Sequence, residues 1–506
     1  MGLIVTLKEF LELKDQFSLG DLMTESFHPD SKNLSTLSNE NLTQAIEVLN
    51  QIDIKALGQL KDKLQDLKPL QKEIGATLEG GGNIYLCGCG ATGRLSLTLE
   101  EIWKKSSPDK DRVRAFMAGG DVAMVRSVEH FEDNPQFGAD HLKELGFCDG
   151  DLLIGITEGG ETSFVIGATE HASKNSHRKP YFVYCNPTKD LVNTAIRSKE
   201  IIENANVNEV CLSCGPMAIS GSTRMQASTI QMLAVGLCLF ETTDLDLQFN
   251  GFMNFFESMR APKFLASFIE SEAREYDSGN YIEYISNELG IVVLTDTTER
   301  SPTFGLPAFE SYHAGSGDIL SHCYFSNSAD DSLKAWRKIL GRDPYPLMWD
   351  DTVELTGMER LLSFDFGLTG KEKRQKRVSG GQKEFLVDKH RDSIKLQFNE
   401  ISHDIELETD NKLFYYSLLK TILNIHSTLV MGRMGRYQGN IMTWVKPANL
   451  KLIDRAIRYT CQILVQNYDL DPGYNEVAKV LFELAKNRTP DESIVLKIIA
   501  FFTAAK

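Results

Sequence analysis

The residues best suited to chemistry begin at Gly88, where the sequence reads GCGATGR between an apolar, strand-like run and a helix-like run. Glycines let backbone N–H groups approach a ligand, and the start of a helix adds partial positive charge. The candidate phosphate-binding residues are Gly90, Ala91, Thr92, Gly93 and Arg94. The spacing also fits the G-x-G-x-x-G fingerprint of dinucleotide sites, which alone is weak evidence. The hydroxyl of Thr92 favours a small phosphorylated ligand over a dinucleotide.

Three later strand-like runs also end in small or hydroxylated residues: AGGD at 118–121, TEGGETS at 157–163 and SGSTRM at 220–225. Ligands of parallel α/β sheets bind at the carboxyl ends of the strands, so these loops are expected to converge on one crevice. They contribute the candidate ligand residues Thr157, Gly159, Ser220 and Ser222. The alternative for any single loop is that Ser and Thr merely cap a helix.

Composition excludes several classes of function. The 506 residues include 54 basic and 70 acidic side chains, a net charge of −16, which does not suit a general nucleic-acid binder. The basic run at 371–377 is interpreted as a solvated loop. No stretch approaches the roughly 18 apolar residues of a membrane span, and the N-terminus lacks the pattern of a signal peptide, so we expect a cytoplasmic protein.

Nine cysteines, an odd number, are scattered along the chain, which is typical of reduced thiols. The pair Cys211-x-x-Cys214 stands without a second pair or a histidine cluster, so burial is favoured over a metal site. We therefore expect no metal and no cofactor.

The order of the elements predicts an α/β fold. Residues 1–70 are predicted as a helical segment, and residues 71–245 as a first domain with a parallel sheet between helices. Residues 246–446 show a faint second round, in which NYIEYISNELG repeats NIYLCGCGATG, and residues 447–506 are predicted as a helical cap. The segment 289–299 is ambiguous, because its β-branched residues favour a strand although its place in the repeat favours a helix.

Several motifs together resemble a known family: TESFHPDSKNLSTLS (24–38), GCGATGR (88–94), VEHFEDNP (128–135), ISGSTRMQAS (219–228) and GRYQGNIM (435–442). The series is similar to bacterial N-acetylmuramic acid 6-phosphate etherase and to the glucokinase regulatory protein. The resemblance implies the sugar-isomerase (SIS) fold, a flavodoxin-like αβα sandwich that binds phosphosugars. At this length the chain resembles the form with two SIS domains in one chain, followed by a helical cap.

The resemblance also implies roles for individual residues. Glu132 and Glu299 take the places of the two catalytic glutamates of the etherase, with Glu132 as the base and Glu299 as the acid. The first half has Ile102 where Glu299 stands in the second. We therefore predict one composite site, with one glutamate from each half. Arg436 replaces a lysine that reaches the sugar phosphate in the family, and its guanidinium suits a phosphate.

One departure counts against turnover. Where the etherases have a serine and an arginine in the loop after the third strand, this chain has Gly159 and Glu161. Two hypotheses follow. In the first, the chain is a phosphosugar sensor that binds a sugar 6-phosphate and docks a sugar kinase or another regulated protein. In the second, it is an active etherase that releases D-lactate from N-acetylmuramic acid 6-phosphate.

Overall fold

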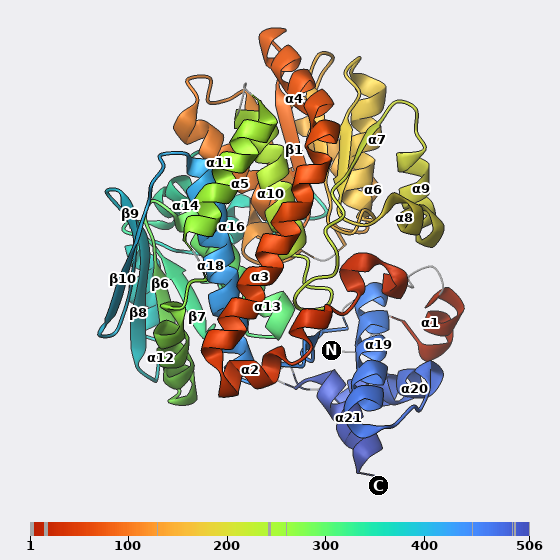
Figure 1. Cartoon of the computed structure of the whole chain (residues 1–506), viewed down its shortest axis with the longest axis vertical. Coiled ribbons are helices and arrows are strands. Elements are labelled where there is room, and N and C mark those ends of the chain that lie inside the picture. Colours follow the sequence, from red (N-terminus) through yellow and green to blue (C-terminus); the bar gives the residue numbers. More distant parts are fainter. Residues whose placement is uncertain are drawn as a thin grey trace.

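Figure 1 shows the computed structural model of the chain, in which two α/β units lie side by side and a helical cluster gathers near both chain ends. The structure describes residues 5–14, 19–128, 130–240, 244–259, 261–447, 449–487, 489 and 492–504. Within these ranges, no helix combines the length and the apolar character that a bilayer crossing requires.

The first unit is built on a fully parallel sheet with strand order β2-β1-β3-β4-β5. Its strands are β1 (Ile84–Gly88), β2 (Val113–Met117), β3 (Leu152–Ile156), β4 (Tyr181–Tyr184) and β5 (Asn208–Cys211). The three central strands are buried along their whole length, as expected of a sheet covered by helices on both faces. The sequence predicts strands in its short β-rich runs NIYLCG, RVRAFMA, DLLIGIT, KPYFVYCNP and NEVCLSC, and the five strands lie in these runs.

The second unit has the strand order β10-β9-β8-β6-β7. Its strands are β6 (Tyr281–Ile285), β7 (Cys323–Ser326), β8 (Gln382–His390), β9 (Ser393–Phe398) and β10 (Ile401–Glu406). β7, β6 and β8 are parallel, whereas β8, β9 and β10 form an antiparallel meander. This half therefore keeps a parallel core and adds an antiparallel edge.

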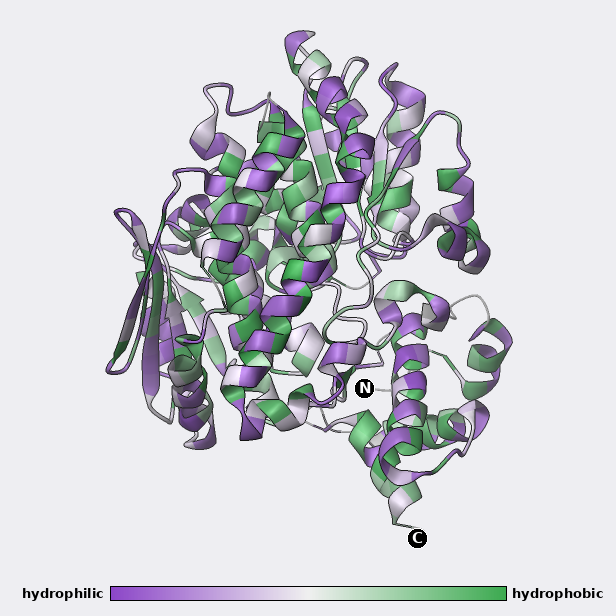
Figure 2. Cartoon of the chain, viewed as in Figure 1, coloured by the Kyte–Doolittle hydropathy of each residue, from purple (hydrophilic) through white to green (hydrophobic). Residues whose placement is uncertain are grey.

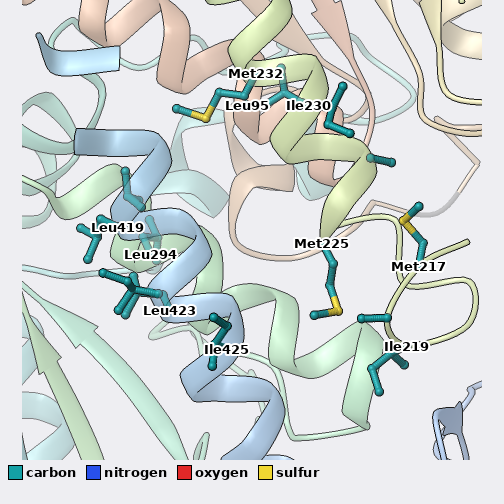
Figure 3. Packing of buried hydrophobic residues seen from close by; sticks show 14 of the residues in the cluster. Leu95, Met217, Ile219, Met225, Ile230, Met232, Leu294, Leu419, Leu423 and Ile425 are labelled. Atoms are coloured by element: carbon teal, nitrogen blue, oxygen red, sulfur yellow. The ribbon is translucent and has the colours of Figure 1, made fainter. Parts of the chain in front are cut away.

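The two halves share a helical interface. In each half the first strand leads into an interface helix, α5 (Ala91–Ser106) after β1 and α13 (Gly290–Phe304) after β6. These pack with α10 (Gln226–Phe240) and α18 (Lys412–Arg433). Figure 3 shows apolar side chains such as Leu95, Met232 and Leu294 filling the space between these helices. This continuous apolar interface makes one body of the two units.

The ambiguous segment 289–299 is helical, within α13. Its apolar residues Ile291, Val292, Val293 and Leu294 are all buried, because α13 is enclosed by α5, α14 and α18. Packing on every side therefore outweighs the β-propensity of these residues.

The remaining helices cover the sheets and the chain ends, and Figure 2 shows hydrophilic residues on the outward sides of the long front helices. They are α1 (Leu7–Leu13), α2 (Leu34–Glu40), α3 (Leu42–Leu60), α4 (Leu64–Glu79), α6 (Pro135–Glu144), α7 (Ser163–Asn175), α8 (Thr188–Thr194), α9 (Ile196–Ile202), α11 (Leu245–Ser258), α12 (Leu265–Asp277), α14 (Ser332–Leu340), α15 (Val353–Thr356), α16 (Met358–Ser363), α17 (Leu368–Gln375), α19 (Leu450–Tyr468), α20 (Tyr474–Leu484) and α21 (Ile494–Thr503). Short 3-10 helices include η3 (Met23–Glu25), η4 (Pro29–Ser31) and η6 (Asp121–Met124), and a two-stranded ribbon joins β11 (Tyr437–Gln438) to β12 (Ile441–Met442).

The interpretation of residues 371–377 as a solvated loop is correct about solvent exposure for most of the run but wrong about its structure. Most of this run lies in α17, and Arg374 is fully buried in an ion pair with Glu310. The basic run therefore helps to build the second half.

Candidate functional site

The glycine loop lies at the carboxyl end of β1 and begins α5. Gly90 has φ +55° and ψ −121°, a conformation that side chains strongly disfavour, and the space beside its Cα is open. A Cβ on Gly93 would collide with Met117 of β2, so this glycine permits close packing of helix and sheet. The Thr92 hydroxyl accepts a hydrogen bond from the Cys89 N–H and donates to the Cys89 carbonyl, each at 2.9 Å. Thr92 therefore holds the shape of the loop.

Arg94 and Glu299 join the two halves directly beneath this loop. They form an ion pair, and both side chains are almost fully buried. The Arg94 guanidinium also donates to the carbonyls of Met124 (2.9 Å) and Ala123 (3.0 Å) in η6. Arg94 is therefore committed to positioning Glu299 of the second half against the first.

Glu132 lies in the loop between η6 and α6, and both halves hold this loop. The Glu132 carbonyl accepts a hydrogen bond from the Phe164 N–H at 3.1 Å. The preceding ring, Phe131, stacks on Trp349 of the second half, with ring centroids 5.9 Å apart. Burial raises the pKa of Glu132, whereas the Lys451 ammonium lowers it. The carboxyl group is therefore placed in an environment that favours its protonated form.

A third carboxyl group, Glu158, is within range of the charges of both glutamates. Its side chain is more than nine-tenths buried, and Oε1 has no hydrogen-bond partner among the described residues. Burial raises the pKa of Glu158 to about 8, and the negative charges of Glu299 and Glu132 act in the same direction. Glu158 therefore lies near enough to a glutamate of each half for their charges to oppose its ionisation.

Glu161 takes part in an ion-pair network. It is the acid that stands where the etherases carry an arginine. It pairs with Lys451 of α19 and with Arg197 of α9, the latter at 2.7 Å. Although burial opposes ionisation, the two cations lower the pKa of Glu161 to about 2. The acid therefore does not present a free charge, and Lys451 brings the C-terminal helices to the edge of the site.

The other residues predicted in the loop after β3 shape its backbone. The Thr157 hydroxyl lies 3.1 Å from the Thr162 hydroxyl and accepts a hydrogen bond from the Gly160 N–H at 3.2 Å. The Gly159 carbonyl accepts from the Asn186 side chain at 3.0 Å. Both predicted residues therefore belong to the same loop as Glu158 and hold it in place.

The loop before α10 is covered by the N-terminal segment and by α19. The Ser220 hydroxyl donates to the Glu25 carbonyl at 2.8 Å, and its own carbonyl accepts from the Tyr459 hydroxyl at 2.8 Å. The buried Ser222 hydroxyl has no partner among the described residues. Of the two predicted serines, Ser222 thus has the hydroxyl available to a ligand, and Ser220 ties the cover to the loop.

A small pocket, with a cavity volume of about 20 Å³, lies at the interface of the halves. Arg224 crosses it to reach Asp296 at 3.1 Å. Lys420 of α18 donates to the Arg224 carbonyl at 2.8 Å, and burial lowers the pKa of Lys420 to about 7. The pocket is lined by Ala91, Leu95, Thr98, Arg224, Ser228, Met232, Val292, Thr295, Asp296, Glu299, Lys420 and Asn424. It therefore runs from the start of α5 to Glu299.

Arg436 lies in the short loop between α18 and β11. Its guanidinium stacks on the Trp444 ring, 4.0 Å from the centroid. Trp444 in turn packs against Gly305, where α13 ends. Arg436 is thus placed beside the helix that carries Glu299.

In the second half, the loop that corresponds to the glycine loop is filled by a side chain of its own domain. The Asp388 carboxylate accepts hydrogen bonds from the backbone N–H groups of Asn287 (3.0 Å) and Glu288 (2.8 Å). These are groups that a bound anion would use. An acidic side chain thus stands where a phosphate would bind.

Sequence reasoning missed Glu158, Lys420, Lys451 and Asp388. Glu158 lies in the motif TEGGETS, which the sequence analysis selects for its glycines and hydroxylated residues and not for its acidic ones. Lys451 and Asp388 carry no local signal, because their importance arises from contacts with segments distant in the chain. Among the described residues, no group of three or more His, Cys, Asp or Glu side chains is arranged to hold a metal ion.

Comparisons with known proteins agree with this architecture. Residues 67–173 match the family model of the glucokinase regulatory protein N-terminal SIS domain. The N-acetylmuramic acid 6-phosphate etherase of Psychromonas ingrahamii is 33% identical over 218 residues, which are 43% of this chain and 68% of the relative. That of Aliivibrio fischeri is 31% identical over 223 residues, covering 44% of this chain and 69% of the relative.

Among solved structures, a putative tagatose-6-phosphate ketose/aldose isomerase from Clostridium novyi aligns with a TM-score of 0.43 and 10% identity, covering 88% of this chain and all of that one. The C-terminal domain of glucosamine-fructose-6-phosphate aminotransferase from Francisella tularensis aligns with a TM-score of 0.40 and 11% identity, covering 78% of this chain and 97% of that one.

The parallel sheet, the glycine loop and the family-model match define an α/β protein of the SIS class, a fold that binds phosphosugars. Within that class, the chain belongs to the family of N-acetylmuramic acid 6-phosphate etherase and the glucokinase regulatory protein.

Proposed function

We propose that the chain binds a hexose or amino-sugar 6-phosphate, of the N-acetylmuramic acid 6-phosphate or fructose 6-phosphate type, at one composite site between two SIS domains. The observation that carries this proposal is the buried ion pair between Arg94 and Glu299. It joins the helix that begins at the glycine loop of the first half to the helix that carries a candidate catalytic glutamate in the second. A ligand held by that loop would therefore meet groups from both halves.

In this proposal, the phosphate lies on the N-terminus of α5, where Gly90 keeps the backbone open and the helix dipole favours an anion. The loop residues Thr157 and Gly159 and the free hydroxyl of Ser222 surround the sugar. Arg436 contributes positive charge from the side of α13.

The chain acts as a sensor in this account, and a sugar kinase or another regulated protein is the proposed partner. The match to the regulatory protein's N-terminal SIS domain supports this role. The ion pairs of Glu161 with Lys451 and Arg197 support this role too. At this position the etherases carry an arginine, whereas this chain has an acid that is held in ion pairs. We propose the same division of the chain as the sequence predicts, with SIS domains at 71–245 and 246–446, a helical segment at 1–70 and a cap at 447–506.

The second candidate function is the etherase reaction, which the pairing of Glu132 with Glu299 favours. In that reaction the aldehyde of the open-chain sugar acidifies C2. One carboxylate removes the C2 proton, and a carboxylic acid protonates the ether oxygen as the C3–O bond breaks, so that lactate leaves and water then adds to the double bond. Because Glu299 is paired with Arg94 and burial raises the pKa of Glu132, this structure suits Glu299 as base and Glu132 as acid. That is the reverse of the order that family resemblance implies.

Two assays on one preparation separate the candidates. The first incubates the protein with N-acetylmuramic acid 6-phosphate and measures D-lactate. The second measures the binding of fructose 6-phosphate by calorimetry. Saturable binding without lactate release supports the sensor. Lactate release that disappears in both Glu132→Gln and Glu299→Gln supports the etherase, and neither binding nor release would contradict both.

A further inference from the structure

Glu158 is a buried carboxyl group without an assigned task. Its Oε1 atom has no hydrogen-bond partner among the described residues, although less than a tenth of the side chain is exposed. Burying a polar atom without a hydrogen-bond partner costs free energy. The unpaired Oε1 atom therefore indicates a hydrogen bond that forms only when a ligand is present.

The pairing of the strands gives Glu158 a counterpart in the second half. Extending the register of β1 and β3 sets Glu158 level with Gly90 of the glycine loop. Extending the register of β6 and β8 sets Asp388 level with Asn287 in the same way. Asp388 uses its carboxylate to bind the N–H groups of its own loop. Glu158 therefore stands at the position from which a carboxyl group reaches a ligand on the glycine loop.

The groups that face Glu158 come from every side of the crevice. Cys89 belongs to the glycine loop, Glu132 precedes α6, Glu299 lies on α13, and Lys451 lies on α19. Behind it, the Cys185 N–H donates to the Glu158 carbonyl at 2.9 Å. Two of these neighbours are carboxyl groups, so a third negative charge here would be repelled by them and would also repel a phosphate.

We propose that Glu158 keeps its proton in the folded protein and donates a hydrogen bond to an oxygen of the bound sugar phosphate. This inference rests on the proposed function. A neutral carboxyl group leaves the N–H groups of the glycine loop to the phosphate, whereas the Asp388 side chain occupies those of the second half. The equivalent loops of the two halves therefore differ. In the first, the backbone N–H groups are available to a ligand, and in the second they are occupied by Asp388.

The raised pKa of Glu158, about 8, makes the proposal sensitive to pH. Near neutral pH the carboxyl group is protonated and acts as a donor. Above the pKa it becomes a negative charge beside the ligand, so affinity for a sugar phosphate should fall. The phosphate itself is already a dianion across this range, and the cationic Lys451 has its pKa raised by Glu161 and Glu132 despite its burial, so neither changes charge.

The test measures fructose 6-phosphate binding by calorimetry at about pH 7 and about pH 9.5. For the wild type we expect a loss of about tenfold or more in affinity at the higher pH. Glu158→Gln keeps a donor and cannot ionise, so its affinity should change less than about threefold between the two pH values. Glu158→Ala should bind at least about tenfold more weakly already at neutral pH. Asp388→Asn, altered at the equivalent position of the other half, should show the wild-type pH profile.

Identical pH profiles for the wild type and Glu158→Gln, or unchanged binding by Glu158→Ala, would overturn the inference while leaving the proposed function intact. If the wild type binds no sugar phosphate at any pH, both the inference and the proposed function are contradicted. A measurement without ligand tests the proton separately. Because the pKa is raised in the folded state, the wild type should lose stability relative to Glu158→Gln as the pH rises from about 4.5 to about 8. A constant difference in melting temperature would show that Glu158 does not hold its proton.

Discussion

The loop after β1 and the loop after β6 occupy equivalent places in the two halves, yet only the first is open. In the first half, Gly90 takes a backbone conformation that favours glycine, and open space lies beside it. In the second half, the N–H groups of Asn287 and Glu288 are already bound by Asp388. In the proposed function, the same strand-loop-helix unit therefore serves as a ligand site in one half and as a self-contained support in the other.

This difference shows how a fused chain can divide the parts of a shared site. The first half contributes the glycine loop with Glu132 and Glu158, and the second contributes Glu299 on the buried helix α13. The antiparallel strands β9 and β10 extend only the second sheet. If only the first half holds a phosphate, as we propose, the second can differ in its sheet provided that it keeps the helix that meets the first half.

Removing the cation that joins the halves should have the largest effect. Arg94→Met leaves Glu299 buried without its partner, which costs about 3–5 kcal/mol of stability, and sugar phosphate binding should be lost. Chemical denaturation and calorimetry give the two quantities. The exposed pair of Lys334 and Asp330 provides the control, because Lys334→Met should leave stability nearly unchanged. A mild effect of Arg94→Met would mean that the halves do not depend on this pair.

Breaking the contact of the cap should come next. Lys451→Met removes one of the two cations that hold Glu161, at a cost of about 2 kcal/mol, and should weaken binding. The folded-state pKa of Glu161 is depressed to about 2, so the network stabilises the wild type above about pH 4.5 and its contribution is lost as the pH falls toward 2. The variant should therefore lose less stability than the wild type on acidification. Parallel acid-unfolding curves would contradict the role of Lys451.

Asp388→Asn should separate stability from binding. The amide can replace only part of the hydrogen bonds that the carboxylate accepts from the Asn287 and Glu288 N–H groups, so we expect a loss of about 1–2 kcal/mol. Binding of fructose 6-phosphate should not change, because this loop lies in the half without an open site. Loss of binding in this variant would show that the second loop takes part in the site.

The smallest effect on stability is expected at Gly90. An added Cβ meets no atom within 4 Å, so Gly90→Ala costs only the strain of its backbone conformation, about 1 kcal/mol, but should weaken phosphate binding at least several-fold. Gly279, which has φ +76° and equally open surroundings in the second half, is the matched control. Gly279→Ala should show a similar loss of stability with normal binding. If Gly90→Ala and Gly279→Ala bind the sugar phosphate equally well, the glycine loop is not part of the binding site.

Much of the first half could be predicted from sequence, because its strands are apolar runs that end in glycine or hydroxylated residues. All five strands lie where they are expected. The second half was harder, since residues 289–299 are β-branched but become a helix enclosed on all sides. The run at 371–377 looked solvated because its charge is visible in the sequence, whereas the burial of Arg374 against Glu310 is not.

The candidate site could be predicted only where its chemistry is local. The glycine loop follows from spacing, and Glu132 and Glu299 follow from resemblance to a family. That Arg94 binds Glu299 depends on how the halves pack. Likewise, the neutralisation of Glu161 by Lys451 depends on where the C-terminal helices settle. Contacts between segments that are distant in the chain depend on the whole fold, so no local sequence pattern predicts them.

The most direct test of the central claim is the stoichiometry of fructose 6-phosphate binding, measured by calorimetry on the wild type and on one variant from each half. We predict one molecule per chain, bound at a single site that both Glu132→Gln in the first half and Glu299→Gln in the second weaken. Two molecules per chain, or a single site that is insensitive to the change in one half, would contradict a composite site.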